Sequence, residues 1–211
     1  MDPIAHFWLV WNRCNELSTL HSFLSANVTK ILEPDELLRA EWVMRVSALD
    51  LYIHELVNKS MVQIFEGIRP STRGYLDFRI SNETLDRIRQ SKTKQEASSA
   101  FDLEVRSQLE RITYQHPDKI ADGIRNCSSI ELWNEVALVL GANDKNKTEH
   151  AKALKKDLSL IVERRNKIAH EGDLKPVSPR EPWPIAKNSL VYVEEKIVKI
   201  VTAIDGIISP V

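Results

Sequence analysis

Apolar residues recur every three or four positions along most of this chain, which is the pattern of helices that bury one face. Runs that alternate apolar and polar residues are few, and the 211 residues include only six glycines. The pattern therefore predicts an all-α protein, with helices at about 3–26, 34–67, 82–90, 100–114, 117–126, 129–141, 147–171 and 188–206.

Three stretches lack this helical period. Ile68–Tyr75 is rich in turn-forming residues, and Ser91–Ser99 is polar, so we expect a break at the first and mobility at the second. Residues 174–186 contain four prolines, which exclude a helix and predict an extended connection over the surface. The final helix is too apolar to stand alone. We therefore expect one domain, 1–211, rather than two domains joined by the proline-rich segment.

The stretch Lys152–Asp173 has a strong helical pattern with polar residues near its end. Arg165 falls on its apolar seam, and an arginine on an apolar face is costly unless it is paired or functional. Asn166 and His170 are four residues apart and share the neighbouring face. Gly172 follows at once and is typical of a left-handed helix stop. The seam itself consists of Leu154, Leu158, Ile161 and Ile168.

The composition is that of a soluble globular protein, with 43% hydrophobic and 28% charged residues. A formal net charge of −1 excludes a globally basic nucleic-acid-binding protein, so any nucleic-acid site must be a local patch. Cys14 and Cys127 are far apart and form no CxxC pair, which argues against a disulfide framework or a zinc site. We expect no metal, no cofactor and no membrane segment, and hence a cytoplasmic protein.

Two segments carry a resemblance to a known family. RNKIAH at 165–170 resembles the Arg-polar-x3-His motif of the HEPN superfamily, and the wider IVERRNKIAHEGD resembles its RiboL-PSP-HEPN branch. RAEWVMRVSALDLYIHELV at 39–57 is similar to the second helix of that branch. The proline-bearing connection and the final helix also fit. Residues 68–127 match no part of the family that we recognise, so we expect them to add helices between the second helix and the helix that carries the motif.

The resemblance implies an antiparallel helical bundle that dimerises around the motif helix. In active members two motifs face each other across the two-fold axis and form a composite, metal-independent endoribonuclease site. Carried over to this chain, the catalytic positions are Arg165, Asn166 and His170. The implied setting is toxin–antitoxin or anti-phage defence, with an antitoxin or regulatory protein as partner. One toxin branch carries a modifiable tyrosine two residues after the histidine; Gly172 stands there, so that modification is not expected.

The chemistry supports the same residues. RNA is cleaved without metal when its 2′-hydroxyl attacks the adjacent phosphate, which requires a base and an acid. Histidine suits both tasks, and arginine stabilises charge that develops on the phosphate. On an ideal helix, however, His170 lies about 140° around the axis from Arg165. Either the last turn distorts, or a second copy of the chain completes the site.

Other polar residues are weaker candidates. Asp50 and His54 border the seam of the second helix, either as a plain flanking pair or with Asp50 orienting Arg165. Glu171 lies beside His170 and either caps the turn or influences that histidine. A basic cluster on the motif helix is either a solvated face or the RNA-backbone contact surface; its members are Lys152, Lys155, Lys156, Arg164 and Lys167.

The leading hypothesis is therefore a homodimeric endoribonuclease that cuts single-stranded RNA. Its first rival is a non-catalytic module of the same superfamily that binds RNA or nucleotides. A third possibility is a structural dimerisation module.

Overall fold

The computed structural model describes residues 2–27 and 34–209. The regular secondary structure of these residues is helical, apart from a single isolated bridge between Leu174 and Pro182. The helices are α1 (Pro3–Asn27), α2 (Asp35–Phe65), α3 (Arg73–Asp77), α4 (Asn82–Gln90), α5 (Lys94–Leu109), α6 (Pro117–Arg125), α7 (Leu132–Val139), α8 (Lys147–Glu171) and α9 (Lys187–Ile208).

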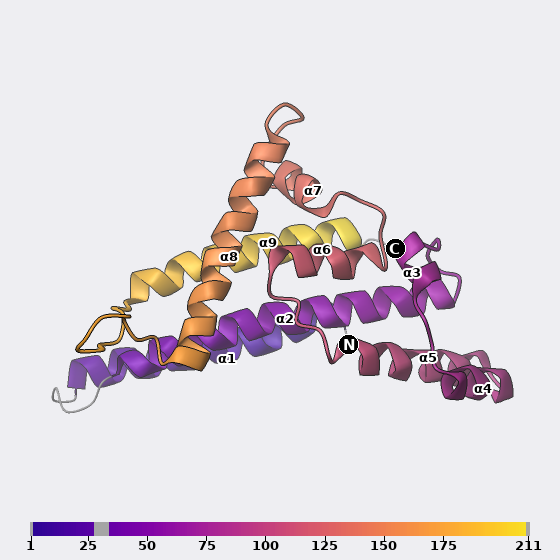
Figure 1. The fold of residues 1–211 in the computed structure, drawn as a ribbon, viewed down its shortest axis with the longest axis horizontal. Coiled ribbons are helices and arrows are strands. Elements are labelled where there is room, and N and C mark those ends of the chain that lie inside the picture. The colour runs from indigo at the N-terminus through magenta and orange to yellow at the C-terminus, as the bar shows by residue number, and fades with distance from the viewer. Residues whose placement is uncertain (1, 28–33, 210–211) are drawn as a thin grey trace.

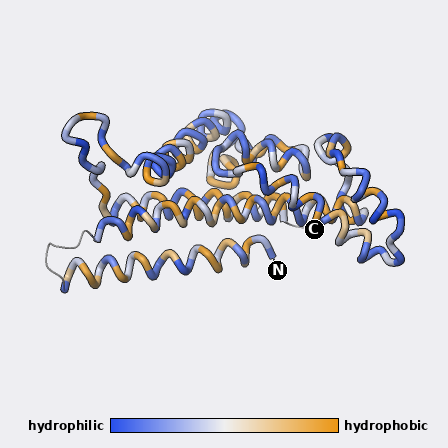
Figure 2. Tube along the Cα trace, turned by 60° about the horizontal axis from the view of Figure 1, so that its bottom comes forward, coloured by the Kyte–Doolittle hydropathy of each residue, from blue (hydrophilic) through white to orange (hydrophobic). Residues whose placement is uncertain are grey.

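Helix α2 is the centre of the bundle. It contacts α1, α5, α6, α8 and α9, and Figure 1 shows it running through the middle of the molecule. Its side chains are buried on several sides, as expected for a helix with neighbours around it; Val46, Leu49, Tyr52 and Ile53 are fully buried. Helix α1 runs back along α2 (Figure 2), while α8 crosses α2 and α9 steeply.

A buried polar network joins α1, α2 and α9. Arg45 of α2 is 1% exposed and donates to Glu41 and to Glu194 of α9. The same guanidinium donates to the carbonyl oxygen of Trp11 in α1 and lies over the ring of that tryptophan. Because a buried guanidinium is tolerated only when its donors are satisfied, this network fixes how the three helices pack.

The predicted all-α class and the helices inserted between α2 and α8 are confirmed. The prediction for 91–99 was wrong, because α5 already begins at Lys94, where the Thr93 side chain accepts a hydrogen bond from the Glu96 N–H. Ser81, rather than Asn82, caps α4. The short helix α3 falls within the expected break. The proline-rich connection 174–186 contains no helix, as expected.

Helix α5 also ends earlier than expected, at Leu109 instead of residue 114. Residues 110–116 instead connect α5 to α6, and we call them the α5–α6 link. In the described residues no helix is long and apolar enough to cross a membrane. Buried apolar side chains from α1, α2 and α5 to α9 pack in one hydrophobic cluster, although the single-domain division itself stays a prediction.

Candidate active site at the end of helix α8

The sequence of α8 fixes both its packing and its end. Leu158, Ile161 and Val162 are buried, and the indole N–H of Trp42 donates to the carbonyl oxygen of Ile161 at 3.0 Å. Gly172 has φ of 63°, the left-handed conformation that glycine adopts at least cost. The N–H groups of Gly172 and the next residue both donate to the carbonyl oxygen of Lys167. The predicted helix stop is therefore present.

A buried carboxylate anchors this end of α8 to the bundle. Asp173 is fully buried, and its Oδ2 accepts hydrogen bonds from Arg39 at 3.1 Å and from Arg164 at 2.7 Å. Both guanidinium groups also donate to the carbonyl oxygen of Trp183 in the proline-rich connection. Arg164 is thus held in a structural cluster, and its role as an RNA contact stays a prediction.

A cleft of about 580 Å³ opens beside the last turns of α8. We call it the motif cleft. One wall comes from α8 and the other from the α5–α6 link and the first turn of α6. Its lining residues are Thr113, Gln115, His116, Asp118, Lys119, Val162, Arg165, Asn166 and His170.

The three motif residues share this cleft within one chain. Arg165 is half-buried rather than buried. Its Nη1 donates to Oδ1 of Asn166 at 3.0 Å. The long arginine side chain therefore turns toward the His170 side of the helix. Arg165 and His170 of one chain thus line the same cleft, although their backbone positions lie about 140° apart on an ideal helix.

Arg165 retains unused hydrogen-bonding capacity. Its Nε is buried and has no hydrogen-bond partner among the described residues. A buried, unpaired guanidinium nitrogen is costly, and Arg164 Nε is in the same state. Lys119 adds a second cation to the wall, while Asp118 lies within 3.4 Å of Lys155 Nζ.

Asp50 holds the opposite wall rather than Arg165. Its carboxylate accepts hydrogen bonds from the Tyr114 N–H at 2.5 Å and from Gln115 Nε2 at 3.0 Å. His54 lies 3.6 Å from Asp50 and packs against the Tyr114 ring. No hydrogen bond or ion pair joins Asp50 to Arg165 among the described residues, so the alternative in which Asp50 orients Arg165 is not found. Both residues instead support the α5–α6 link.

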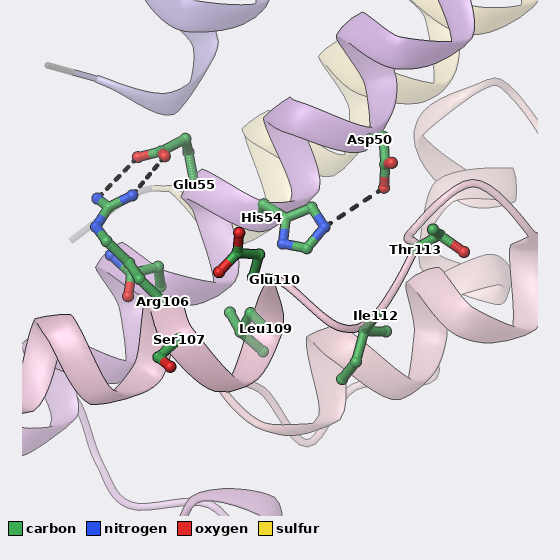
Figure 3. A pocket seen from close by; sticks show the side chains of 10 residues that line it. Asp50, His54, Glu55, Arg106, Ser107, Leu109, Glu110, Ile112 and Thr113 are labelled. Atoms are coloured by element: carbon green, nitrogen blue, oxygen red, sulfur yellow. Dashed lines mark hydrogen bonds and ion pairs between the residues drawn. The ribbon is translucent and has the colours of Figure 1, made fainter.

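Asp50 and His54 line a separate hollow, also of about 580 Å³, which shares Thr113 with the motif cleft (Figure 3). Glu55 and Glu110 add two further carboxylates to this hollow. The Arg106 guanidinium lowers the pKa of Glu55, so that carboxylate stays ionised. The excess of negative charge in this hollow disfavours the binding of a phosphate. The motif cleft instead has two cationic side chains, Lys119 and Arg165, and one carboxylate, Asp118.

The remaining predicted residues lie along α8 and differ in exposure. Lys152, Lys156 and Lys167 are exposed on α8, and Lys155 is paired with Asp118. Glu171 is exposed at the last residue of the helix. None of the described His, Cys, Asp and Glu residues gather in a group of three or more that could hold a metal ion.

Sequence reasoning missed His116 and Lys119. They lie about 50 residues before the motif in a region without a recognisable pattern. The available signal was Pro117, which marks a helix start and so places His116 at the N-cap of α6. Nothing in the sequence showed that this helix start lies beside the end of α8.

A family model described as RiboL-PSP-HEPN matches residues 12–210. The chain belongs to the RiboL-PSP-HEPN family. The match includes residues 68–127, in which the sequence motifs alone showed no resemblance to the family. No curated protein and no solved structure shows a significant match to the chain. HEPN domains are often ribonucleases and commonly bind RNA and dimerise, but the superfamily also has non-catalytic members. The motif cleft of this RiboL-PSP-HEPN protein is therefore a candidate RNA site.

Proposed function

We propose that this RiboL-PSP-HEPN protein is a metal-independent endoribonuclease that cuts single-stranded RNA in the motif cleft. The observation that supports this most strongly is the convergence of Arg165, Asn166 and His170 on one cleft.

The proposed reaction needs no group beyond the chain and the RNA. A base removes the proton of the 2′-hydroxyl, whose oxygen attacks the adjacent phosphorus. The bond from phosphorus to the 5′-oxygen breaks, and an acid protonates that oxygen. The products are a 2′,3′-cyclic phosphate and a 5′-hydroxyl. His170 serves as one of the two proton-transfer groups, because imidazole changes charge near neutral pH.

Arg165 and Asn166 act on the phosphate rather than on protons. A guanidinium stabilises the negative charge that builds up on the non-bridging oxygens during attack. Asn166 accepts a hydrogen bond from Arg165 and so holds the guanidinium in the cleft. An alanine at position 166 would leave the arginine free to swing into solvent.

Exposed lysines on α8 provide a path for the RNA backbone. Lys152, Lys156 and Lys167 project within about 60° of the direction of His170 on an ideal helix. They extend over roughly 27 Å of helix between residues 152 and 170. Glu163 interrupts this stripe, so the attraction is local and should weaken steeply with salt.

The proposal includes a homodimer, since HEPN domains commonly dimerise, and it retains the toxin–antitoxin or defence setting as a hypothesis. A second copy would place two motif clefts near one another and enlarge the surface that binds RNA. An antitoxin or regulatory protein would act by covering this surface.

Incubation of 5′-labelled single-stranded RNA with purified protein in EDTA tests the proposal. We expect fragments that end in a 2′,3′-cyclic phosphate. RNA that is bound but left intact would contradict the proposal and favour the RNA-binding module. Absence of both binding and cleavage would favour the dimerisation module.

A further inference from the structure

We propose that the hollow beside His54 binds a linear polyamine, a flexible molecule whose ammonium groups are separated by methylene segments. We call this cavity the acidic hollow, because Asp50, Glu55 and Glu110 give it three carboxylates. Its volume of about 580 Å³ is within the range of small-ligand pockets. The inference goes beyond the proposed ribonuclease and does not depend on it.

An unpaired acceptor in the acidic hollow is the first observation. Asn58 lines the hollow and is only 2% exposed. Its Nδ2 donates to Oδ1 of Asp102 at 2.7 Å, and since an ionised carboxylate only accepts, this contact fixes which end of the amide is the nitrogen. The other end, Oδ1, is buried and has no hydrogen-bond partner among the described residues. A buried acceptor without a donor is costly, so the hollow favours a ligand that brings N–H groups.

The charges of the hollow select a cation. Arg106 donates to both oxygens of Glu55, at 2.6 and 3.0 Å, and so neutralises that carboxylate. Glu110 is exposed and forms no ion pair within the described part of the chain. Asp50 accepts two hydrogen bonds, whereas a carboxylate offers about four acceptor positions. The hollow also lies at the C-terminal end of α5, where the helix dipole attracts positive charge. Two carboxylates therefore remain for a cationic ligand.

The spread of these groups argues against a single metal ion and favours an elongated ligand. A metal ion needs several ligands around one point, and no described cluster of three or more His, Cys, Asp and Glu residues meets this requirement. Figure 3 shows the carboxylates of Asp50, Glu110 and Glu55 distributed along the hollow. Leu109 and Ile112 also line it and offer apolar surface to methylene segments. A linear polyamine has charges at intervals with such segments between them.

A ligand in the acidic hollow would also restrain one wall of the motif cleft. Thr113 lines both cavities. Asp50 holds the α5–α6 link through the Tyr114 N–H and the Gln115 amide. A polyamine bound between Asp50 and Glu110 would bridge α2 and the end of α5, and the link follows directly after that end. We therefore expect bound polyamine to slow hydrogen exchange at the Tyr114 amide.

Calorimetric titration of spermidine into the purified full chain, without RNA, tests the site. The proteins are the wild type, Glu110→Gln, Glu110→Lys and Glu195→Lys. Glu195 is an exposed carboxylate of α9 outside the hollow, so Glu195→Lys changes the net charge as much as Glu110→Lys does. We expect saturable binding by the wild type and by Glu195→Lys. Glu110→Gln should weaken binding by about 10-fold or more, since it removes a charge-assisted hydrogen bond, and Glu110→Lys should abolish it.

Equal binding by Glu110→Lys and Glu195→Lys would overturn the proposal, because the attraction would then depend on net charge alone. Absence of saturable binding by the wild type at millimolar spermidine, or displacement of spermidine by an equal concentration of Mg²⁺, would also overturn it. Hydrogen exchange at the Tyr114 amide localises the effect: spermidine should slow it in the wild type and leave it unchanged in Glu110→Lys. Because no RNA is present, failure here leaves the proposed ribonuclease standing, and failure of RNA cleavage leaves this site standing.

Discussion

At the residue scale, a buried cluster of charged side chains around Asp173 holds the end of α8. Its role is structural. Asp173 accepts hydrogen bonds from two arginines through one oxygen, and Arg39 also bonds to Glu36. Arg39 is 7% exposed, so removal of Asp173 leaves this buried charge with only the exposed Glu36 as its partner. The cluster ties α8 and the proline-rich connection to α2.

We expect Asp173→Ala to lower the free energy of unfolding by about 3–5 kcal/mol, since breaking one side of a buried ion pair costs that much. The midpoint of urea denaturation measures the change. Glu195→Ala, an exposed carboxylate near Lys199, is the control and should shift stability by less than about 0.5 kcal/mol. Equal midpoints for the two variants would show that the cluster does not hold the fold.

The candidate site residues could be predicted where their motif is contiguous in the sequence. Arg165, Asn166 and His170 follow from a six-residue pattern. The partial burial of Arg165 could not be predicted, because it depends on how α8 packs against the rest of the protein. Nor could the partners of Asp50, since its hydrogen bonds reach residues 64 and 65 positions away.

At the element scale, the α5–α6 link shows how tertiary contacts override a local pattern. Ile112 continues the apolar spacing of α5 and suggested a longer helix. The Tyr114 N–H instead donates to Asp50, and the chain leaves the helix at Leu109. The helix stop at Gly172, by contrast, was predictable, because glycine determines it without help from distant residues.

Asp50→Ala should release the α5–α6 link. We expect a loss of about 1–3 kcal/mol of stability, because the Tyr114 N–H loses its acceptor. Hydrogen exchange at the Tyr114 amide should accelerate, and RNA cleavage should fall because the α5–α6 link forms one wall of the motif cleft. Asp86→Ala, which alters an exposed carboxylate of α4, is the control. An unchanged exchange rate at Tyr114 in Asp50→Ala would contradict this role.

At the scale of the whole molecule, the all-α class and the family followed from helical periods and two short segments. The path of α3 to α7 did not, because it is set by packing between helices rather than by a local signal: α5 and α6 contact α2, and α7 contacts α8 and α9. That path brings the start of α6 beside α8 and so creates the second wall of the motif cleft. The site is thus a product of the inserted helices as well as of the motif helix.

The homodimer is also tested at this scale. Leu160 is 52% exposed on α8, and a dimer around the motif helix would cover it. We expect light scattering to give the mass of two chains for the wild type and of one chain for Leu160→Glu. Leu103→Glu, at an equally exposed leucine of α5, should stay dimeric. A wild-type protein with the mass of one chain would exclude the dimer.

The most direct test of the proposed ribonuclease is cleavage of labelled single-stranded RNA in EDTA by the wild type, Arg165→Ala, His170→Ala and His150→Ala. All four proteins should show the same helical circular dichroism. We expect the wild type and His150→Ala to cut, and the two motif variants to lose at least about 100-fold in rate. Full cleavage by His170→Ala, or none by the wild type, would contradict the assignment of the motif cleft as a ribonuclease site.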